Sequence, residues 1–145
     1  MIHKFRLIRN GKIVGYEQHI LRPQCGDDNL NVICVCYSTP KQLENPRHYP
    51  RCSCFDKADF IFHDHKDMFT GLHDSEGQEI YEGDVVEDNC NEVGGRYLGS
   101  RILRITFMDG CFSAESRHNA VCLYEMTPGT FLKVIGNIHE EAQNE

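Results

Sequence analysis

Residues 101–114, RILRITFMDGCFSA, decide the fold class of this chain. Apolar and polar side chains alternate on both sides of Asp109-Gly110, and a period of two is typical of a half-buried strand. Aspartate followed by glycine supplies the two positive φ angles of a type I′ turn, the commonest two-residue hairpin connection. The stretch therefore predicts a β-hairpin. Asn10-Gly11 predicts a second hairpin, between strands at residues 5–9 and 12–16.

Further strands are predicted where β-branched and aromatic residues cluster between turn residues. They are residues 30–37, 58–63, 67–72, a strand beginning at residue 85, residues 121–126 and residues 131–138. Pro40, Pro46 and Pro50 crowd one stretch, which excludes a central strand there and predicts a surface loop. Helical periodicity of any length is absent from the sequence.

These patterns predict an all-β fold. The two arrangements consistent with eight or so short strands are a small barrel and packed antiparallel sheets, in either case with an N-terminal β-hairpin extension. We favour the barrel, because closure removes exposed sheet edges.

Length and charge limit the functions to be considered. The 145 residues are a usual length for one domain. The formal charge of −7 and the pI near 5.6 repel the phosphates of nucleic acids, so a nucleic-acid partner is not expected. Arg96, Arg101 and Arg104 form the densest basic stretch, which indicates either a solvated strand face or a local nucleic-acid groove.

Targeting signals are not apparent in the sequence. No apolar run approaches the roughly 20 residues that cross a bilayer, and the N-terminus lacks the apolar centre of a signal peptide. We therefore expect a cytoplasmic protein with no membrane partner. In that compartment the eight cysteines are expected to be reduced.

Two separated motifs carry a family resemblance. Residues 69–86, FTGLHDSEGQEIYEGDVV, and residues 134–140, VIGNIHE, resemble in the same order the signature and closing segment of the YopX family of phage and prophage proteins. The resemblance implies a β-rich domain with an SH3-like barrel component, no assigned catalytic residues and a bacterial host cell. We expect one YopX-like domain over residues 1–140, more divergent over residues 1–66, and a disordered tail at residues 141–145.

The motif residues have a structural explanation. Glycines fit turns, an aspartate can cap its own turn, and the apolar members can supply core. The residues expected to support the fold in this way are Thr70, Gly71, Asp74, Gly77, Ile80, Tyr81, Gly83, Asp84, Gly136 and Asn137. The functional alternative is that Asp74, Glu82 and Asp84 converge to hold a cation through their oxygen atoms.

Four cysteines are the sharpest candidate metal ligands. Cys34, Cys36, Cys52 and Cys54 match the four thiolates that zinc takes. Their spacing fits less well, because cysteines two apart on a strand face the same side but stand about 6.5–7 Å apart. If the two segments pair as a hairpin, all four thiols can cluster on one face. The alternative is that they are reduced cysteines that pack in the core, with no cofactor bound.

The run from His63 to Asp67, with His73 and Asp74 beyond it, is a second candidate site for a metal or for acid-base chemistry. A polar strand end explains the same run. Motifs of nucleophilic or nucleotide-dependent enzymes are absent, so we do not expect an enzyme.

The function predicted from the sequence is a non-catalytic binding or modulating module of phage or prophage origin. Its expected partner is a phage or host protein, bound through loops or a sheet edge, and self-association into a homo-oligomer is a further option. The alternatives are a nucleic-acid accessory protein with a small barrel and a zinc-binding protein that uses the cysteine cluster.

Overall fold

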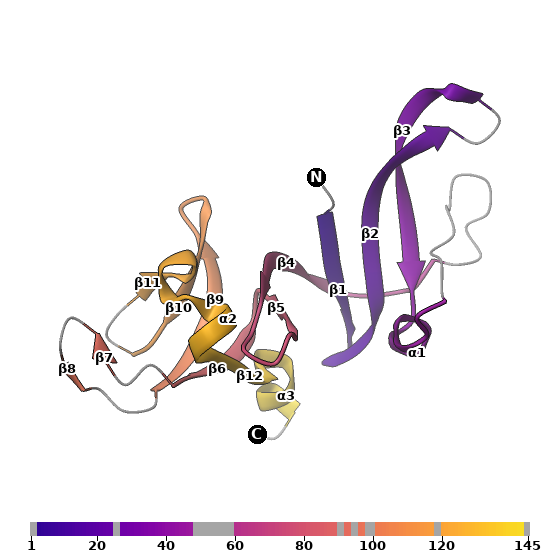
Figure 1. Ribbon diagram of the computed structural model, residues 1–145. Coiled ribbons are helices and arrows are strands. Elements are labelled where there is room, and N and C mark those ends of the chain that lie inside the picture. The colour runs from indigo at the N-terminus through magenta and orange to yellow at the C-terminus, as the bar shows by residue number, and fades with distance from the viewer. Residues whose placement is uncertain are drawn as a thin grey trace. The chain divides into compact units, whose positions relative to one another are not determined.

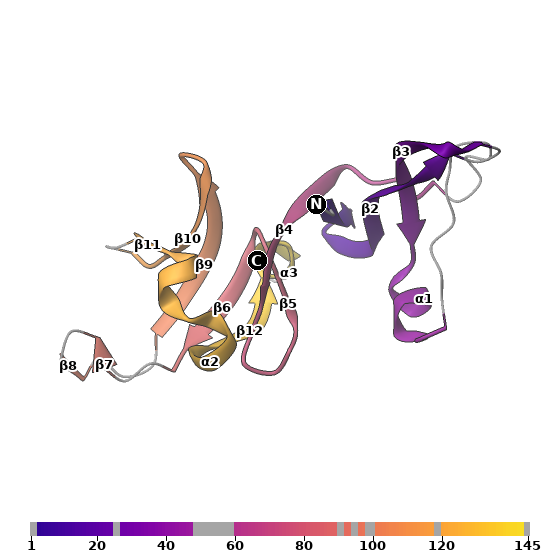
Figure 2. The ribbon, with the colours of Figure 1, turned by 45° about the horizontal axis from the view of Figure 1, so that its top comes forward.

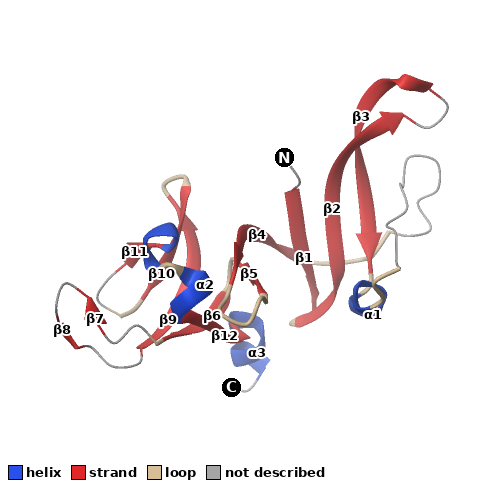
Figure 3. Cartoon of the chain, in the orientation of Figure 1, coloured by secondary structure: helices blue, strands red, loops and turns tan. Residues whose placement is uncertain are grey.

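The computed structural model describes residues 3–24, 27–47, 60–89, 92–93, 96–97, 101–117 and 120–143. Strands account for most of these residues, so the prediction of an all-β fold is confirmed (Figure 3). Contacts within the chain divide it into two compact units, Met1–Met68 and Phe69–Glu145. The expectation of one YopX-like domain over residues 1–140 stays a prediction.

The described strands follow one another along the chain as β1 (His3–Arg9), β2 (Lys12–Gln24), β3 (Asp27–Ser38), β4 (His65–His73), β5 (Glu79–Tyr81), β6 (Asp84–Asp88), β7 (Glu92–Val93), β8 (Arg96–Tyr97), β9 (Arg101–Met108), β10 (Cys111–Glu115), β11 (Ala120–Cys122) and β12 (Leu132–Asn137). The described helices are short: α1 (Pro40–Glu44), the 3₁₀ helix η2 (Leu123–Met126), α2 (Pro128–Phe131) and α3 (Ile138–Gln143).

The N-terminal unit is an antiparallel sheet in the order β3-β2-β1-β4 (Figure 1). β1 and β2 turn at Asn10 and Gly11, whose φ angles of 52° and 76° are those of the predicted type I′ turn. β2 continues into the long hairpin with β3. Residues 65–68 of β4 pair with β1, and residues 69–73 of the same strand carry the chain into the second unit.

The C-terminal unit contains the sheet β11-β10-β9-β6-β12, in which every pair of neighbours is antiparallel (Figure 2). The hairpin of β9 and β10 turns at Asp109 and Gly110, with φ angles of 54° and 79°, so this prediction is confirmed as well. The second half of β4 pairs with β5.

Most side chains of the core are aliphatic and come from the strands of each unit. In the N-terminal unit they are Leu7, Ile8, Cys34 and Cys36. In the C-terminal unit they are Ile80, Tyr81, Val85, Val86, Leu103, Ile105, Phe112, Ala114, Leu123 and Leu132.

The predicted barrel is not formed by the described strands. Closure requires the two outermost strands of a sheet to pair with each other. Because β4 pairs with both β1 and β5, the first sheet has the full order β3-β2-β1-β4-β5, and its outermost strands are β3 and β5. The outermost strands of the second sheet are β11 and β12. In neither sheet do the outermost described strands pair with each other. The alternative of antiparallel sheets is the arrangement found.

Some predicted boundaries were wrong. Of the strand predicted at residues 58–63, residues 60–63 form no strand, and residues 58–59 lie outside the described residues. Residues 121–126 divide into β11 and the helix η2. The described helices have four to six residues, which is too short for a helical period to show in the sequence. α3 extends to Gln143, and the disordered tail expected over residues 141–145 stays a prediction.

Among the described residues, no helix has the length and apolar character needed to cross a membrane.

Candidate functional site

Charged, aromatic and exposed apolar side chains lie together on one face of the N-terminal sheet. Glu17 on β2 is the direct partner of Tyr37 on β3, and Leu21 is the direct partner of Ile33 four residues further on. Side chains two residues apart on a strand point to the same side. These four side chains therefore share a face.

A buried carboxylate lies at the centre of this face. The Tyr37 hydroxyl donates to Glu17 Oε1 at 3.0 Å, and Lys66 Nζ donates to Glu17 Oε2 at 3.0 Å. His19 Nε2 lies 3.0 Å from the same Oε2 atom. Both oxygens of a carboxylate that is 5% exposed are thus held by donors from three strands.

These contacts control the protonation of the carboxylate. Burial acts to raise the pKa of Glu17, but the hydrogen bonds from His19, Lys66 and Tyr37 together outweigh it, so the pKa lies below the usual 4.5. Burial and the neighbouring Glu17 carboxylate raise the pKa of Tyr37 to about 12. At neutral pH Glu17 is therefore ionised and Tyr37 is a protonated donor.

Aromatic rings surround this carboxylate. Phe5 lies 5.5 Å from the ring of His19, and Lys66 Nζ sits 4.5 Å from the centre of the Phe5 ring, within cation–π range. On the other side, Tyr37 contacts Phe60 edge to face at 5.1 Å, and Phe60 contacts Phe62 at 5.3 Å. The rings thus form two groups, one joined to Glu17 through His19 and the other through Tyr37.

Four large apolar side chains of this face are open to solvent. The exposed fractions are 63% for Leu21, 68% for Ile33, 41% for Phe60 and 71% for Phe62. Exposed apolar groups that lie together with polar residues among them are typical of an interaction site. We use the name aromatic face for the set Phe5, Glu17, His19, Leu21, Ile33, Tyr37, Phe60, Phe62 and Lys66.

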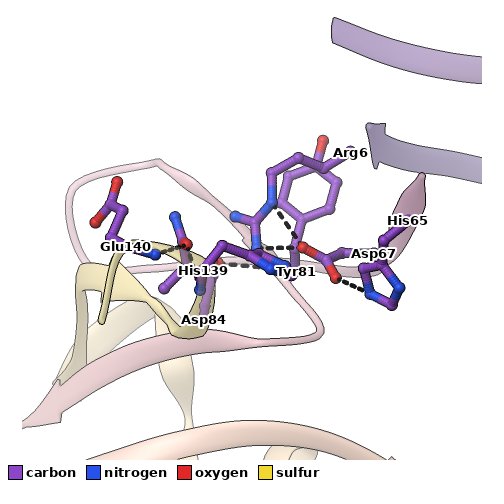
Figure 4. A network of polar contacts seen from close by, with 8 residues as sticks. Arg6, His65, Asp67, Tyr81, Asp84, His139 and Glu140 are labelled. Carbon is purple, nitrogen blue, oxygen red and sulfur yellow. Dashed lines mark hydrogen bonds and ion pairs between the residues drawn. The ribbon is translucent and has the colours of Figure 1, made fainter. Parts of the chain in front are cut away.

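The opposite side of the same sheet contains part of the predicted histidine and aspartate site. Arg6 donates to Asp67 Oδ2 through Nη2 at 2.8 Å and Nε at 3.1 Å, while His65 Nε2 lies 3.0 Å from Asp67 Oδ1 (Figure 4). Asp67 and Arg6 are 1% and 5% exposed. The pair joins β4 to β1, which is a structural role.

The other polar residues of that run have separate partners. His63 Nδ1 lies 2.8 Å from the Ile61 carbonyl oxygen, and Asp64 accepts a hydrogen bond from the Asn10 backbone. His73 contacts the Phe69 ring at 5.7 Å. The run from His63 to His73 is therefore distributed among different local contacts.

The cysteine cluster is described only in part. Cys34 and Cys36 lie on β3, are 0% and 1% exposed, and face the side opposite to Glu17 and Tyr37. Cys52 and Cys54 lie outside the described residues. The zinc site stays a prediction.

In the C-terminal unit, Asp74 holds together the turn between β4 and β5. Its Oδ1 accepts from the backbone N–H groups of Glu76 at 2.9 Å and Gln78 at 2.8 Å, and its Oδ2 accepts from Val134 of β12 at 2.9 Å. Gly77 in the same turn has a φ of +84°, which glycine adopts without strain. Asp74 therefore caps its own turn.

The remaining motif residues also serve the backbone. Asp84 Oδ2 accepts from the Tyr81 N–H at 2.8 Å (Figure 4). Asn137 Oδ1 caps α3 by accepting from the N–H groups of His139 and Glu140 at 3.0 Å each. Thr70 Oγ1 donates to the Ile80 carbonyl at 2.7 Å.

Three motif glycines lie where a side chain would be strained or crowded. Gly71 and Gly83 have φ angles of +84° and +85°. A Cβ added at Gly136 would lie 3.2 Å from Glu140 Oε2, at the point where the register of β12 shifts. Among the described residues, Asp74, Glu82 and Asp84 do not gather as a cation-binding group.

Arg101 and Arg104, from the basic stretch noted in the sequence, have different surroundings. Arg101 Nη2 donates to the buried Asp88 at 2.7 Å, and the side chain of Arg104 is exposed. Arg101 therefore forms an ion pair between β9 and β6.

Glu17, His19 and Tyr37 were not singled out in the sequence, and Lys66 was included only as a member of the run from His63 to Asp67. They lie on three strands, and their meeting depends on the register of the β2–β3 hairpin, which local pattern does not fix. The one signal in the sequence was Glu17 itself, a charged residue at a position of the strand that is buried in the fold.

Comparisons with known proteins agree with the motifs. A family model described as YopX protein matches residues 57–143. A search of the curated proteins found no match. A crystal structure of protein EF1440 from Enterococcus faecalis is similar over 98% of this chain and 96% of its own, with 19% identity and a TM-score of 0.48.

Proposed function

We propose that this chain, which belongs to the YopX family, is a phage- or prophage-derived, cytoplasmic, non-catalytic module that binds a protein of the phage or its bacterial host. The binding surface is the aromatic face. Phe5, Glu17, Leu21, Ile33 and Tyr37 precede the residues matched by the family model, so partner choice would belong to this chain's own N-terminal unit.

The exposure of Leu21, Ile33, Phe60 and Phe62 on one face carries the proposal. Burying one such side chain on binding contributes about 1.5–3 kcal/mol. A few buried apolar anchors commonly dominate the energy of a protein interface. Four side chains within one face are enough for such a centre.

The Glu17 contacts suit the same role. Docking removes water, and an unpaired carboxylate would then cost several kcal/mol. Here both oxygens already have donors before any partner arrives. The polar centre of the aromatic face can therefore be covered without leaving a charge unpaired.

The test is a comparison of surface variants. Tagged full-length chain, Phe62→Ser and Ile33→Ser are used to recover proteins from a bacterial host lysate, with Ile135→Ser as the matched control. Ile135 is 48% exposed and lies in the other unit. We expect a partner, identified by mass spectrometry, that is retained by wild type and the control and lost with both face variants. Recovery that is equal for all four proteins refutes the proposal.

Two further measurements separate the other classes of partner. Sedimentation of the purified chain shows whether the partner is a second copy. Titration of a fluorescent single-stranded oligonucleotide at low salt tests the nucleic-acid alternative, and binding that Phe62→Ser abolishes would replace protein with nucleic acid as the partner.

A further inference from the structure

The C-terminal unit contains a cavity that neither the aromatic face nor the family motif uses. Its volume is about 380 Å³, and it is lined by Ile102, Arg104, Glu115, Ser116 and Arg117. This volume is within the range of small-molecule sites, which begins at roughly 300 Å³. The cavity lies in the described residues of β9 and at the end of β10.

The sheet register explains why these side chains meet. Arg104 on β9 and Glu115 on β10 are direct antiparallel partners. Ile102 lies two residues before Arg104 and shares its side of β9. Ser116 and Arg117 continue the chain directly beyond the last residue of β10.

Charge and donor geometry favour a phosphate. A guanidinium group presents several N–H donors in a planar fork that matches phosphate oxygens, and the cavity has two such groups in Arg104 and Arg117. Together with the Glu115 carboxylate, the two arginines give the lining a net charge of +1, which attracts an anion. The Ser116 hydroxyl can add one more donor to a phosphate oxygen.

The other two lining residues limit what accompanies the phosphate. Glu115 is acceptor-only when ionised, so it can accept from a hydroxyl or amine donor on the same ligand. Ile102 is 56% exposed and offers an apolar wall on which a flat ring can rest. A bare phosphate ion would use the arginines and leave Glu115 as a repulsive neighbour.

We infer that this cavity binds a small phosphate monoester that also carries hydrogen-bond donors, of the chemical class of nucleoside monophosphates. The inference is independent of the proposed protein partner, because the two surfaces belong to different units of the chain. Arg104 and Arg117 bind the phosphate, Ser116 donates to it, and Glu115 accepts from the hydroxyl or amine groups.

The experiment is a titration of the full-length chain with adenosine 5′-monophosphate, inorganic phosphate and adenosine, followed by calorimetry and by amide chemical shifts. We expect the monophosphate to bind more tightly than either fragment, with shifts centred on residues 102–104 and 115–117. Arg117→Ala should weaken binding at least about tenfold, since it removes a charge-assisted contact. Arg117 is exposed, so this variant is expected to fold.

Arg47→Ala, which removes an exposed arginine of the N-terminal unit, is the matched control and should bind as wild type does. Adenosine binding as tightly as its monophosphate, equal affinity of wild type and Arg117→Ala, or shifts centred on residues 60–62 would each overturn the inference. An oligonucleotide without a terminal phosphate that binds more tightly than the monophosphate would also overturn it, in favour of a nucleic-acid backbone.

Discussion

Replacing Asp74 by alanine should destabilise the C-terminal unit more than a turn substitution usually does. The carboxylate is 3% exposed and accepts three backbone hydrogen bonds, two within its own turn and one from Val134 on β12. Alanine removes both acceptor oxygens and with them all three hydrogen bonds. The variant therefore loses two hydrogen bonds that hold the turn and the one that joins the turn to β12.

The size of the effect follows from these contacts. A hydrogen bond to a charged group contributes about 1.5–3 kcal/mol. Glu76 and Gln78 are exposed, so water can replace the carboxylate at their amides, whereas Val134 is half-buried. With that allowance we expect a loss of about 3–5 kcal/mol for Asp74→Ala. Asp74→Asn keeps one acceptor and should lose about half as much.

The assay is urea unfolding followed by far-UV circular dichroism, together with hydrogen exchange at the Val134 amide. Asp109→Asn is the control, because Asp109 is an exposed hairpin residue with a φ of 54° that asparagine also tolerates. It should stay within about 0.5 kcal/mol of wild type. The reasoning is refuted if Asp74→Ala also stays within that margin or if exchange at Val134 is unchanged.

Three further predictions concern the N-terminal unit. Asp67→Asn leaves the buried Arg6 without its counter-charge and should cost about 3–5 kcal/mol in urea unfolding, and a loss below about 1 kcal/mol would contradict this. Gly15→Ala places a Cβ 2.8 Å from the Ser38 carbonyl oxygen, so its thermal midpoint should fall, and an unchanged midpoint would show that the strands separate freely there. Because the pKa of Glu17 is lowered, its stabilisation is present above pH 4.5 and is lost as pH falls through the folded-state pKa. Wild type should therefore lose more stability between pH 5 and pH 3 than Glu17→Gln, and parallel curves would refute the assignment.

The parts of the fold that were predictable are those set by neighbouring residues. Asn10-Gly11 and Asp109-Gly110 each define a hairpin, because the backbone angles of a two-residue turn are a property of the turn itself. The capping role of Asp74 within its own turn is local in the same way. Its contact with Val134 was not predictable, since it joins residues 60 positions apart.

The site was less predictable than the fold. Residues 60–63 have the alternation of a strand, but they form none, and Phe60 packs against the ring of Tyr37, which lies 23 positions earlier in the sequence. The contacts of Glu17 likewise depend on strand pairing over long distances in sequence. The spacing of neighbouring residues was therefore enough to suggest the cysteines and histidines as candidate sites. It was not enough to predict the aromatic face, whose residues meet only through strand pairing.

The contact between Asp74 and Val134 has a consequence for synthesis. Ser75 donates to the Leu132 carbonyl at 2.8 Å, so two bonds join the turn after β4 to β12, the last of the described strands along the sequence. At about 5–20 residues per second, a ribosome needs about 3–12 s to add the 60 residues between the two partners. During that interval the turn has only its four internal hydrogen bonds, two of which end at Asp74 Oδ1. Loss of β12 from the growing chain would thus remove two contacts of a turn that was completed long before it.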